Sequence, residues 1–154
     1  MTDTRWLDAE EMRAWEVFLA AGALVDREIE QHLKSEGLSH TQYETLVRLS
    51  AAPRGRLRMT ELAAALYSSK SGLSYQIGRL EQAGLVRREA ADADDRGVVA
   101  ILTAAGRERL AEIAPGHVAT VRRALIDVLT DQQRRALTDG LGAVVARLSG
   151  PGNR

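Results

Sequence analysis

The hydrophobic pattern of this chain switches from a period of 3.6 residues to a period of 2 at about residue 85. Before that point, apolar residues recur at the 3.6-residue spacing of amphipathic helices. Residues 85–89 and 98–102 instead predict two short strands, and the segment between them is too rich in Asp and Gly to be helical. Two helices joined by a tight turn and followed by a β-hairpin can pack into only a few kinds of small domain.

Helix start signals divide the first part of the chain. Asp8 with Glu11 predicts a long helix that runs to about Glu36, and Ser39 with Gln42 predicts a second helix. Each pair places a polar side chain where it can bind the free amide groups of the first helical turn. The sequence therefore opens with two helices.

A short extended segment at 56–59 follows. Thr60 is placed to cap a third helix, and Ser69 is placed to cap a fourth over 70–83. Gly84 can end this fourth helix in a left-handed turn. The predicted hairpin comes directly afterwards.

The last part of the chain is also predicted to be helical. Thr103 is placed to cap a long helix in which Pro115 and Gly116 predict a kink, and Thr130 with Gln133 predicts the final helix. The expected fold class is mostly α with a small β-hairpin (α+β).

Composition excludes several kinds of chemistry. The 154 residues include no cysteine, which excludes disulfides, thiolate metal sites and redox sensing through a thiol. No apolar run approaches the roughly 20 residues of a transmembrane helix, and the acidic N-terminus does not resemble a secretory signal, so we expect a cytoplasmic protein without membrane contact. No nucleophile elbow, phosphate-binding loop or dinucleotide fingerprint is found, so we do not expect an enzyme.

Charge is distributed unevenly although the net charge is zero. Residues 1–47 carry four basic and ten acidic side chains, whereas residues 48–88 carry eight basic and two acidic ones. A central basic block suits a protein that contacts phosphate groups with one region. A solvated charged surface without a partner would show the same pattern.

Residues 39–106 resemble the MarR (multiple-antibiotic-resistance regulator) family of winged helix-turn-helix repressors. The matching segments are MTELAAAL at 59–66, SSKSGLSYQIGRLEQAGLV at 68–86 and DDRGVVAILTAAG at 94–106. The third segment is similar to the wing signature of that family, and the long end helices match in length and place.

The resemblance implies a winged helix-turn-helix lobe and dimerisation helices contributed by both ends of the chain. We expect the lobe to span 38–104. The dimerisation helices are expected at 1–36 and 105–149, with a disordered tail at 150–154.

The fourth helix is the expected recognition helix. Its inward stripe consists of Leu73, Ile77 and Leu80, and its opposite face carries groups that can bind base edges or phosphates. Gln76 is able to pair bidentately with adenine. An exposed polar face without a partner is the alternative. The candidate DNA-binding residues are Ser69, Lys70, Ser71, Ser74, Tyr75, Gln76 and Arg79.

The hairpin supplies a second candidate contact. By resemblance, Arg96 at its tip enters a narrow minor groove, and Asp94 holds the guanidinium through a bidentate pair. A surface salt bridge that stabilises the turn is the alternative, and both roles can hold at once.

The end helices have apolar faces too wide for one small domain to cover, with Trp15 and Phe18 in the first and Leu137 and Leu141 in the last. Interdigitation of these helices in a homodimer would cover them. A two-fold dimer implies a pseudo-palindromic operator, with recognition helices about 34 Å apart.

The resemblance also implies release from DNA by a small aromatic or phenolic anion. The candidate ligand-binding residues are Trp15, His40 and Tyr43, each with an ordinary packing or surface role as the alternative. His32, His40 and His117 are widely separated along the chain and predict no metal site, and no cofactor is expected.

These features predict a ligand-responsive transcriptional repressor that binds double-stranded DNA as a homodimer. The alternative is a winged-helix module that binds protein, for instance as an antagonist of another regulator, without binding DNA. Lys70, Arg96 and the basic block favour DNA, because a protein-binding module would not need them.

Overall fold

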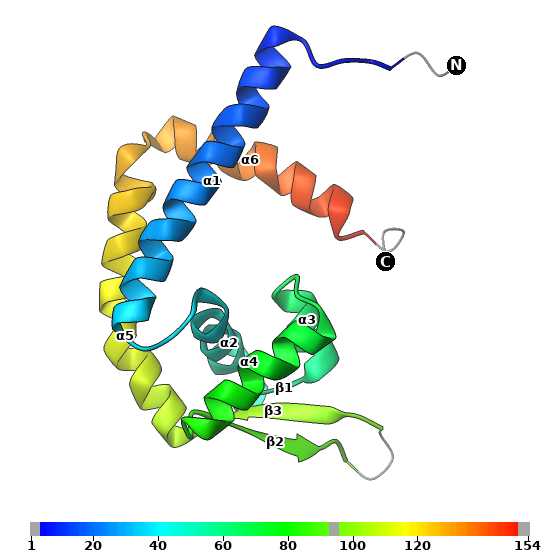
Figure 1. Cartoon of the computed structure of the whole chain (residues 1–154), viewed down its shortest axis with the longest axis vertical. Coiled ribbons are helices and arrows are strands. Elements are labelled where there is room, and N and C mark those ends of the chain that lie inside the picture. The colour runs from blue at the N-terminus through cyan, green and yellow to red at the C-terminus, as the bar shows by residue number, and fades with distance from the viewer. Residues whose placement is uncertain (1–3, 93–95, 151–154) are drawn as a thin grey trace. The chain divides into compact units, whose positions relative to one another are not determined.

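The computed structural model describes residues 4–92 and 96–150, which form six α-helices, two 3-10 helices and three β-strands (Figure 1). The chain divides into two compact units. One comprises Met1–Glu28 with Val118–Arg154, and the other comprises Ile29–His117. The mostly helical fold with a small sheet confirms the predicted fold class.

Both predicted start signals in the first part of the chain are confirmed. Helix α1 (Ala9–Ser35) begins after Asp8, whose Oδ1 accepts the amide of Glu11 at 2.8 Å. Helix α2 (His40–Ala51) begins with the reciprocal pair that Ser39 and Gln42 predict. These ends are encoded within four residues, so local sequence is sufficient to place them.

The predicted cap of the third helix is wrong. The short strand β1 (Arg56–Arg58) leads directly into α3 (Met59–Ala65), which begins one residue before Thr60. The amide of Arg58 donates to Glu61 Oε2 at 3.0 Å, so Glu61 closes the helix start in place of the Thr60 hydroxyl. A 3-10 turn, η1 (Pro53–Gly55), precedes the strand.

Helix α4 (Lys70–Gln82) has the predicted cap and the predicted end. The Ser69 hydroxyl accepts the amide of Gly72 at 3.2 Å. Gly84 has a φ of +73°, and the amide of Leu85 returns to the carbonyl of Leu80 at 3.0 Å. This left-handed turn directs the chain from the helix into the hairpin.

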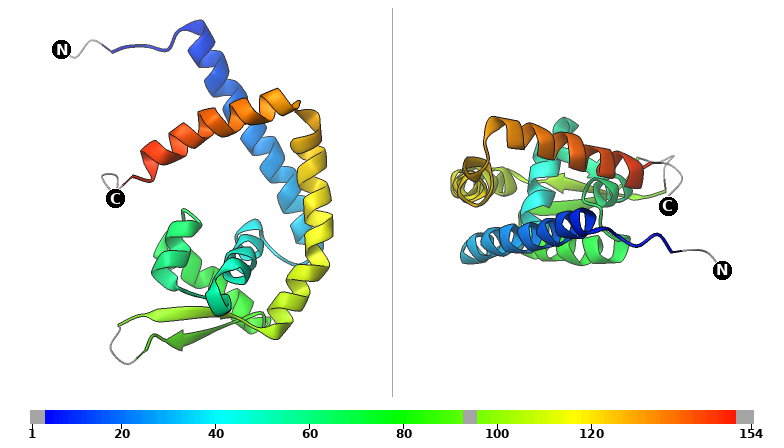
Figure 2. Two further views of the ribbon diagram at one scale, coloured as in Figure 1. Left: turned by 180° about the vertical axis from the view of Figure 1, so that it is seen from behind. Right: turned by 90° about the horizontal axis from the view of Figure 1, so that it is seen from above.

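The hairpin consists of β2 (Val86–Ala90), one residue later than predicted, and β3 (Val98–Leu102), as predicted. The sheet order is β1-β3-β2 and all pairs are antiparallel, with Val86 opposite Leu102. Figure 2 shows the hairpin extending beyond the rest of the sheet. The core of this unit includes Leu33, Leu46, Leu49, Leu62, Leu73, Ile77, Leu80, Ala100 and Ile113.

The last helices are α5 (Ala104–Ala124) and α6 (Asp131–Leu148), separated by η2 (Ile126–Val128). Pro115 lies inside α5 and does not end it, and a kink there stays a prediction. The Thr130 start of α6 is confirmed.

The unit built from the two chain ends leaves large apolar side chains in contact with solvent. None of the residues of α6 is buried, and Trp15 in α1 is 50 % exposed. The other exposed apolar residues of this unit include Val17, Phe18, Leu19, Leu24, Leu137, Leu141, Val144, Val145 and Leu148. In residues 4–92 and 96–150, no helix combines the length and the hydropathy that crossing a membrane requires.

Candidate nucleic-acid interface

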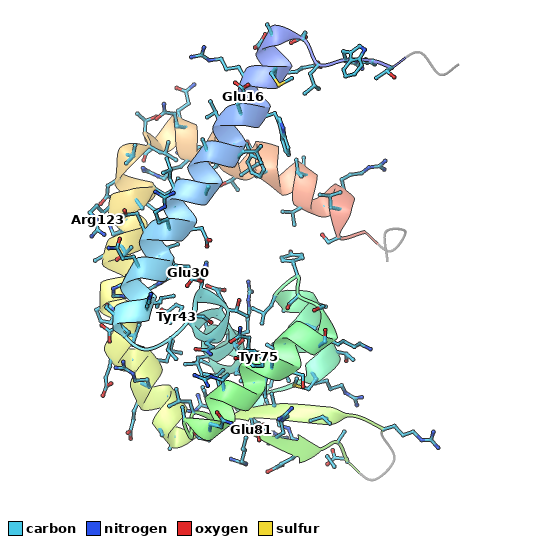
Figure 3. The ribbon with its side chains drawn as sticks, in the orientation of Figure 1. Glu16, Glu30, Tyr43, Tyr75, Glu81 and Arg123 are labelled. Atoms are coloured by element: carbon cyan, nitrogen blue, oxygen red, sulfur yellow. The ribbon has the colours of Figure 1, made fainter. Side chains whose placement is uncertain are left out.

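Helix α4 presents two different faces. Leu73, Ile77 and Leu80 are fully or almost fully buried, as the inward stripe predicts. Tyr75 is 66 % exposed on the other side and is labelled in Figure 3. The other exposed candidate residues of this helix and its cap are Ser69, Lys70, Ser71, Ser74 and Arg79.

Gln76 differs from the other candidates because it is part-buried and already engaged. Its Oε1 accepts a hydrogen bond from Nε2 of Gln42 at 2.9 Å. Gln42 also closes the start of α2 through its own Oε1, which accepts the amide of Ser39 at 3.0 Å. Gln76 therefore links α2 to α4, and a bidentate contact with adenine requires reorganisation of this link.

One cation of this surface, Arg88 on β2, is not among the residues that the sequence predicts. Arg88 Nη1 donates to Ser74 Oγ at 3.2 Å, and Arg88 Nε donates to the carboxylate of Glu81. Its position after the recognition helix is visible in the sequence, but an alternating strand does not reveal that its side chain reaches back to α4.

A concave surface of about 410 Å³ lies beside the first turns of α4. Lys70 and Arg88 supply two cationic groups, and Thr60, Ser71 and Ser74 supply hydroxyls. The remaining lining residues are Met59 and Val98. None of these residues is acidic, so the chemistry of this surface suits an anion.

The wing is described in part. Arg96 is exposed, and the hairpin is closed beside it by a hydrogen bond from the amide of Ala91 to the carbonyl of Gly97 at 3.0 Å. Asp94 lies outside the described residues, so its predicted pairing with Arg96 stays a prediction. The DNA contact of Arg96 and its alternative, a surface salt bridge that stabilises the turn, both stay predictions.

Three histidines that are distant in the sequence lie together in space. The ring centroid of His117 is 6.5 Å from that of His32 and 6.4 Å from that of His40. Tyr43 packs against the same ring with a centroid distance of 4.2 Å. Gly116 makes this packing possible, because a Cβ there would lie 2.8 Å from Cε1 of His32.

The histidine cluster, defined as His32, His40 and His117, is partly shielded from water. The buried ring atoms Nε2 of His32 and Nδ1 of His117 have no hydrogen-bond partner in the described part of the chain. Burial lowers the pKa of His117, and the nearby His40 lowers this pKa further. Burial also raises the pKa of Tyr43, with a smaller contribution from Glu44.

The three predicted ligand-binding residues fall into different parts of the chain. His40 and Tyr43 lie at the start of α2, where Tyr43 is buried and His40 lines a cavity of about 560 Å³. Trp15 belongs to the other unit, where it stacks against Phe18 with a centroid distance of 6.0 Å. The structure therefore brings His40 and Tyr43 together and does not assign Trp15 to the same site.

The fold and this surface define a winged helix-turn-helix protein. Helices α3 and α4 with the turn between them are followed by a β-hairpin, and the exposed face of α4 is polar and cationic. In this class, the second helix enters the major groove.

Comparison with known proteins identifies the family. The sequence profile of the MarR family matches residues 36–97. The chain is 42 % identical to AbsC, a MarR family transcriptional regulator from Streptomyces coelicolor, over 94 % of this chain and 98 % of that one, with a TM-score of 0.89. It is 41 % identical to Sco3205 of the same organism, whose structure contains DNA, over 98 % and 95 % of the two chains, with a TM-score of 0.93.

A third relative is YkoM of Bacillus subtilis, an uncharacterized HTH-type transcriptional regulator. The identity is 30 % over 122 residues, which cover 79 % of this chain and 78 % of that protein. The chain belongs to the MarR family of transcriptional regulators.

Proposed function

We propose that this protein is a transcriptional repressor that binds a pseudo-palindromic operator as a homodimer, with α4 in the major groove and the β2–β3 hairpin in the minor groove. The observation that carries this proposal is the exposed face of α4. Lys70, Ser71, Ser74, Tyr75 and Arg79 are all exposed there, while the apolar stripe of the same helix is buried. The structure of the relative Sco3205 with DNA supports the same use of the fold.

A homodimer is supported by the apolar surface of the unit formed by the chain ends. Leu141 and Val145 of α6 and Phe18 of α1 are between 37 % and 49 % exposed in the single chain. Large apolar side chains that stay exposed in this number favour an interface, and most soluble oligomers are two-fold dimers. Two recognition helices related by such an axis would meet half-sites about one turn, roughly 34 Å, apart.

Regulation without catalysis and a cytoplasmic location are parts of this proposal. The similar proteins carry names of transcriptional regulators, one of them the transcriptional repressor YetL of Bacillus subtilis. Repression is supported by that name.

The experiment is selection of bound duplexes from a random palindromic pool, followed by fluorescence anisotropy at 50 and 200 mM salt. We expect affinity to fall steeply with salt, because bound cations are released from phosphates. Arg96→Ala is expected to weaken binding by about 1–3 kcal/mol and to leave the sedimentation coefficient of the dimer unchanged. Failure of the wild-type protein to bind any duplex at low salt would refute the proposal.

We also propose that a small aromatic anion regulates DNA binding at the α2 cavity. This cavity of about 560 Å³ is lined by His40, Arg48 and Tyr67, among others. Arg48 lies 4.0 Å from Glu44 and keeps a side chain 49 % exposed, so a carboxylate can compete for it. Titration of the DNA complex with benzoate should release DNA from the wild type at lower concentrations than from Arg48→Gln. If the same benzoate concentration releases DNA from both proteins, the proposed ligand site is wrong.

A further inference from the structure

The side chain of Arg88 lies along one side of helix α4. Residues Ser74, Gly78 and Glu81 are spaced at i, i+4 and i+7, which places them on one side of the helix. The Arg88 guanidinium binds the first and the last of them, as described above. A Cβ at Gly78 would have Arg88 Nη2 as its nearest neighbour, at 3.8 Å. The guanidinium thus lies along the helix beside Gly78, which has no side chain.

The guanidinium retains donors for another partner. It carries five N–H groups, of which one on Nε and one on Nη1 are used by Glu81 and Ser74. In the described part of the chain, Nη2 has no hydrogen-bond partner. Arg88 also lines the concave surface of about 410 Å³ together with Lys70. The two cations and three hydroxyls there offer donors to an anion.

We propose that Arg88 binds a backbone phosphate of the operator through Nη2 and thereby fixes the position of α4 in the major groove. This proposal rests on the proposed DNA-binding function. The hydrogen bond to Ser74 and the ion pair with Glu81 hold the guanidinium in place before DNA arrives, which reduces the entropy lost on binding. Phosphate contacts of this kind set the register and orientation of a protein on the duplex.

A purely structural role for Arg88 is the competing explanation, in which the ion pair only fastens β2 to α4. The two roles predict opposite changes in DNA affinity for the substitution Glu81→Gln. Arg88→Gln and Glu81→Gln both break the ion pair, so a structural fastening would weaken DNA binding similarly in both variants. Only Arg88→Gln removes the group that binds phosphate, whereas Glu81→Gln removes a negative charge near DNA.

The experiment measures the affinity of the full-length protein for the selected duplex by anisotropy at four salt concentrations. Arg88→Gln is expected to bind at least tenfold more weakly at 100 mM salt, because it cannot form the charged hydrogen bond to phosphate. The slope of log K against log salt should become shallower by about 0.9 for each phosphate that a subunit no longer neutralises. Glu81→Gln is expected to bind about twofold more tightly with an unchanged slope, because it removes a negative charge near DNA while the amide oxygen of Gln can still accept from Arg88 Nε.

Folding of both variants is checked by circular dichroism and by the urea midpoint, and Arg88→Lys serves as a second variant that keeps the charge. Arg88→Lys should keep the wild-type salt slope. Equal weakening in Arg88→Gln and Glu81→Gln, or an unchanged slope in Arg88→Gln, overturns the proposal. Wild-type protein that binds no duplex would refute the proposed function itself, so the two failures are distinguishable.

Discussion

Gly106 in the first turn of α5 permits a close approach of backbone to backbone that no other residue type allows. A Cβ at this buried position would lie 2.6 Å from Cδ1 of Leu102 and 3.1 Å from the carbonyl carbon of Leu85, and closer still to the Leu85 oxygen. That oxygen accepts the amide of Thr103 at 3.1 Å. The substitution Gly106→Ala must therefore displace the turn between α4 and β2.

The size of the effect follows from three contributions to the free energy of unfolding. Overpacking of this kind destabilises by about 1–3 kcal/mol, and weakening of the Thr103 hydrogen bond removes about 1 kcal/mol. Alanine stabilises a helix by about 1 kcal/mol relative to glycine. The net loss for Gly106→Ala is therefore about 1–3 kcal/mol.

Gly78→Ala is a matched control in the same unit, because its Cβ would meet Arg88 at an ordinary distance of 3.8 Å. This variant should gain about 1 kcal/mol from helix propensity alone. The assay is urea unfolding followed by circular dichroism at one protein concentration, with equal m-values as the test of two-state behaviour. If Gly106→Ala is as stable as Gly78→Ala, the steric explanation is wrong.

Three further predictions concern pH, coupling and assembly. Folding lowers the pKa of His117, so the unfolded chain gains the proton first as pH falls below about 6.5. The free energy of unfolding should therefore decrease at acidic pH. Urea midpoints at pH 7.5 and 5.5 should differ less in His117→Asn than in the wild type. A double-mutant cycle of Gln42→Ala and Gln76→Ala should give a coupling of about 0.5–1.5 kcal/mol in unfolding free energy, because the two side chains are hydrogen-bonded. Additive effects would contradict this hydrogen bond. Leu141→Glu should yield folded monomers in sedimentation velocity, because this side chain is already partly exposed in the single chain; a dimer of unchanged affinity would place the interface elsewhere.

Local signals predicted most of the fold. The Ser39, Ser69 and Thr130 caps and the Gly84 turn are encoded within a few residues, and the structure has all of them. The error at Thr60 has the same local origin, since Arg58 and Thr60 can each precede a helix start and Glu61 favours the earlier one. Local competition of this kind shifts the end of an element by one or two residues without changing the fold.

Contacts between elements were not predictable in the same way. Arg88 reaches Ser74 across 14 positions, and Gln42 reaches Gln76 across 34. Periodicity assigned Gln76 to the flank of the recognition face but could not show that another helix occupies its carbonyl oxygen. The histidine cluster is hidden for the same reason, because proximity of side chains from three helices depends on how the helices pack.

Residues in the first turn of α2 take part in several of these unpredicted contacts. Ser39 and Gln42 close the helix start on each other, the amide of His40 donates to Glu30 of α1 at 3.0 Å, and Tyr43 packs on the α5 imidazole. Gln42 also holds the recognition helix. A ligand in the cavity proposed above, beside His40, would therefore act within two residues of the side chain that contacts α4. It can shift α4 if it binds one arrangement of this turn more tightly than another, since differential affinity is what moves such an equilibrium.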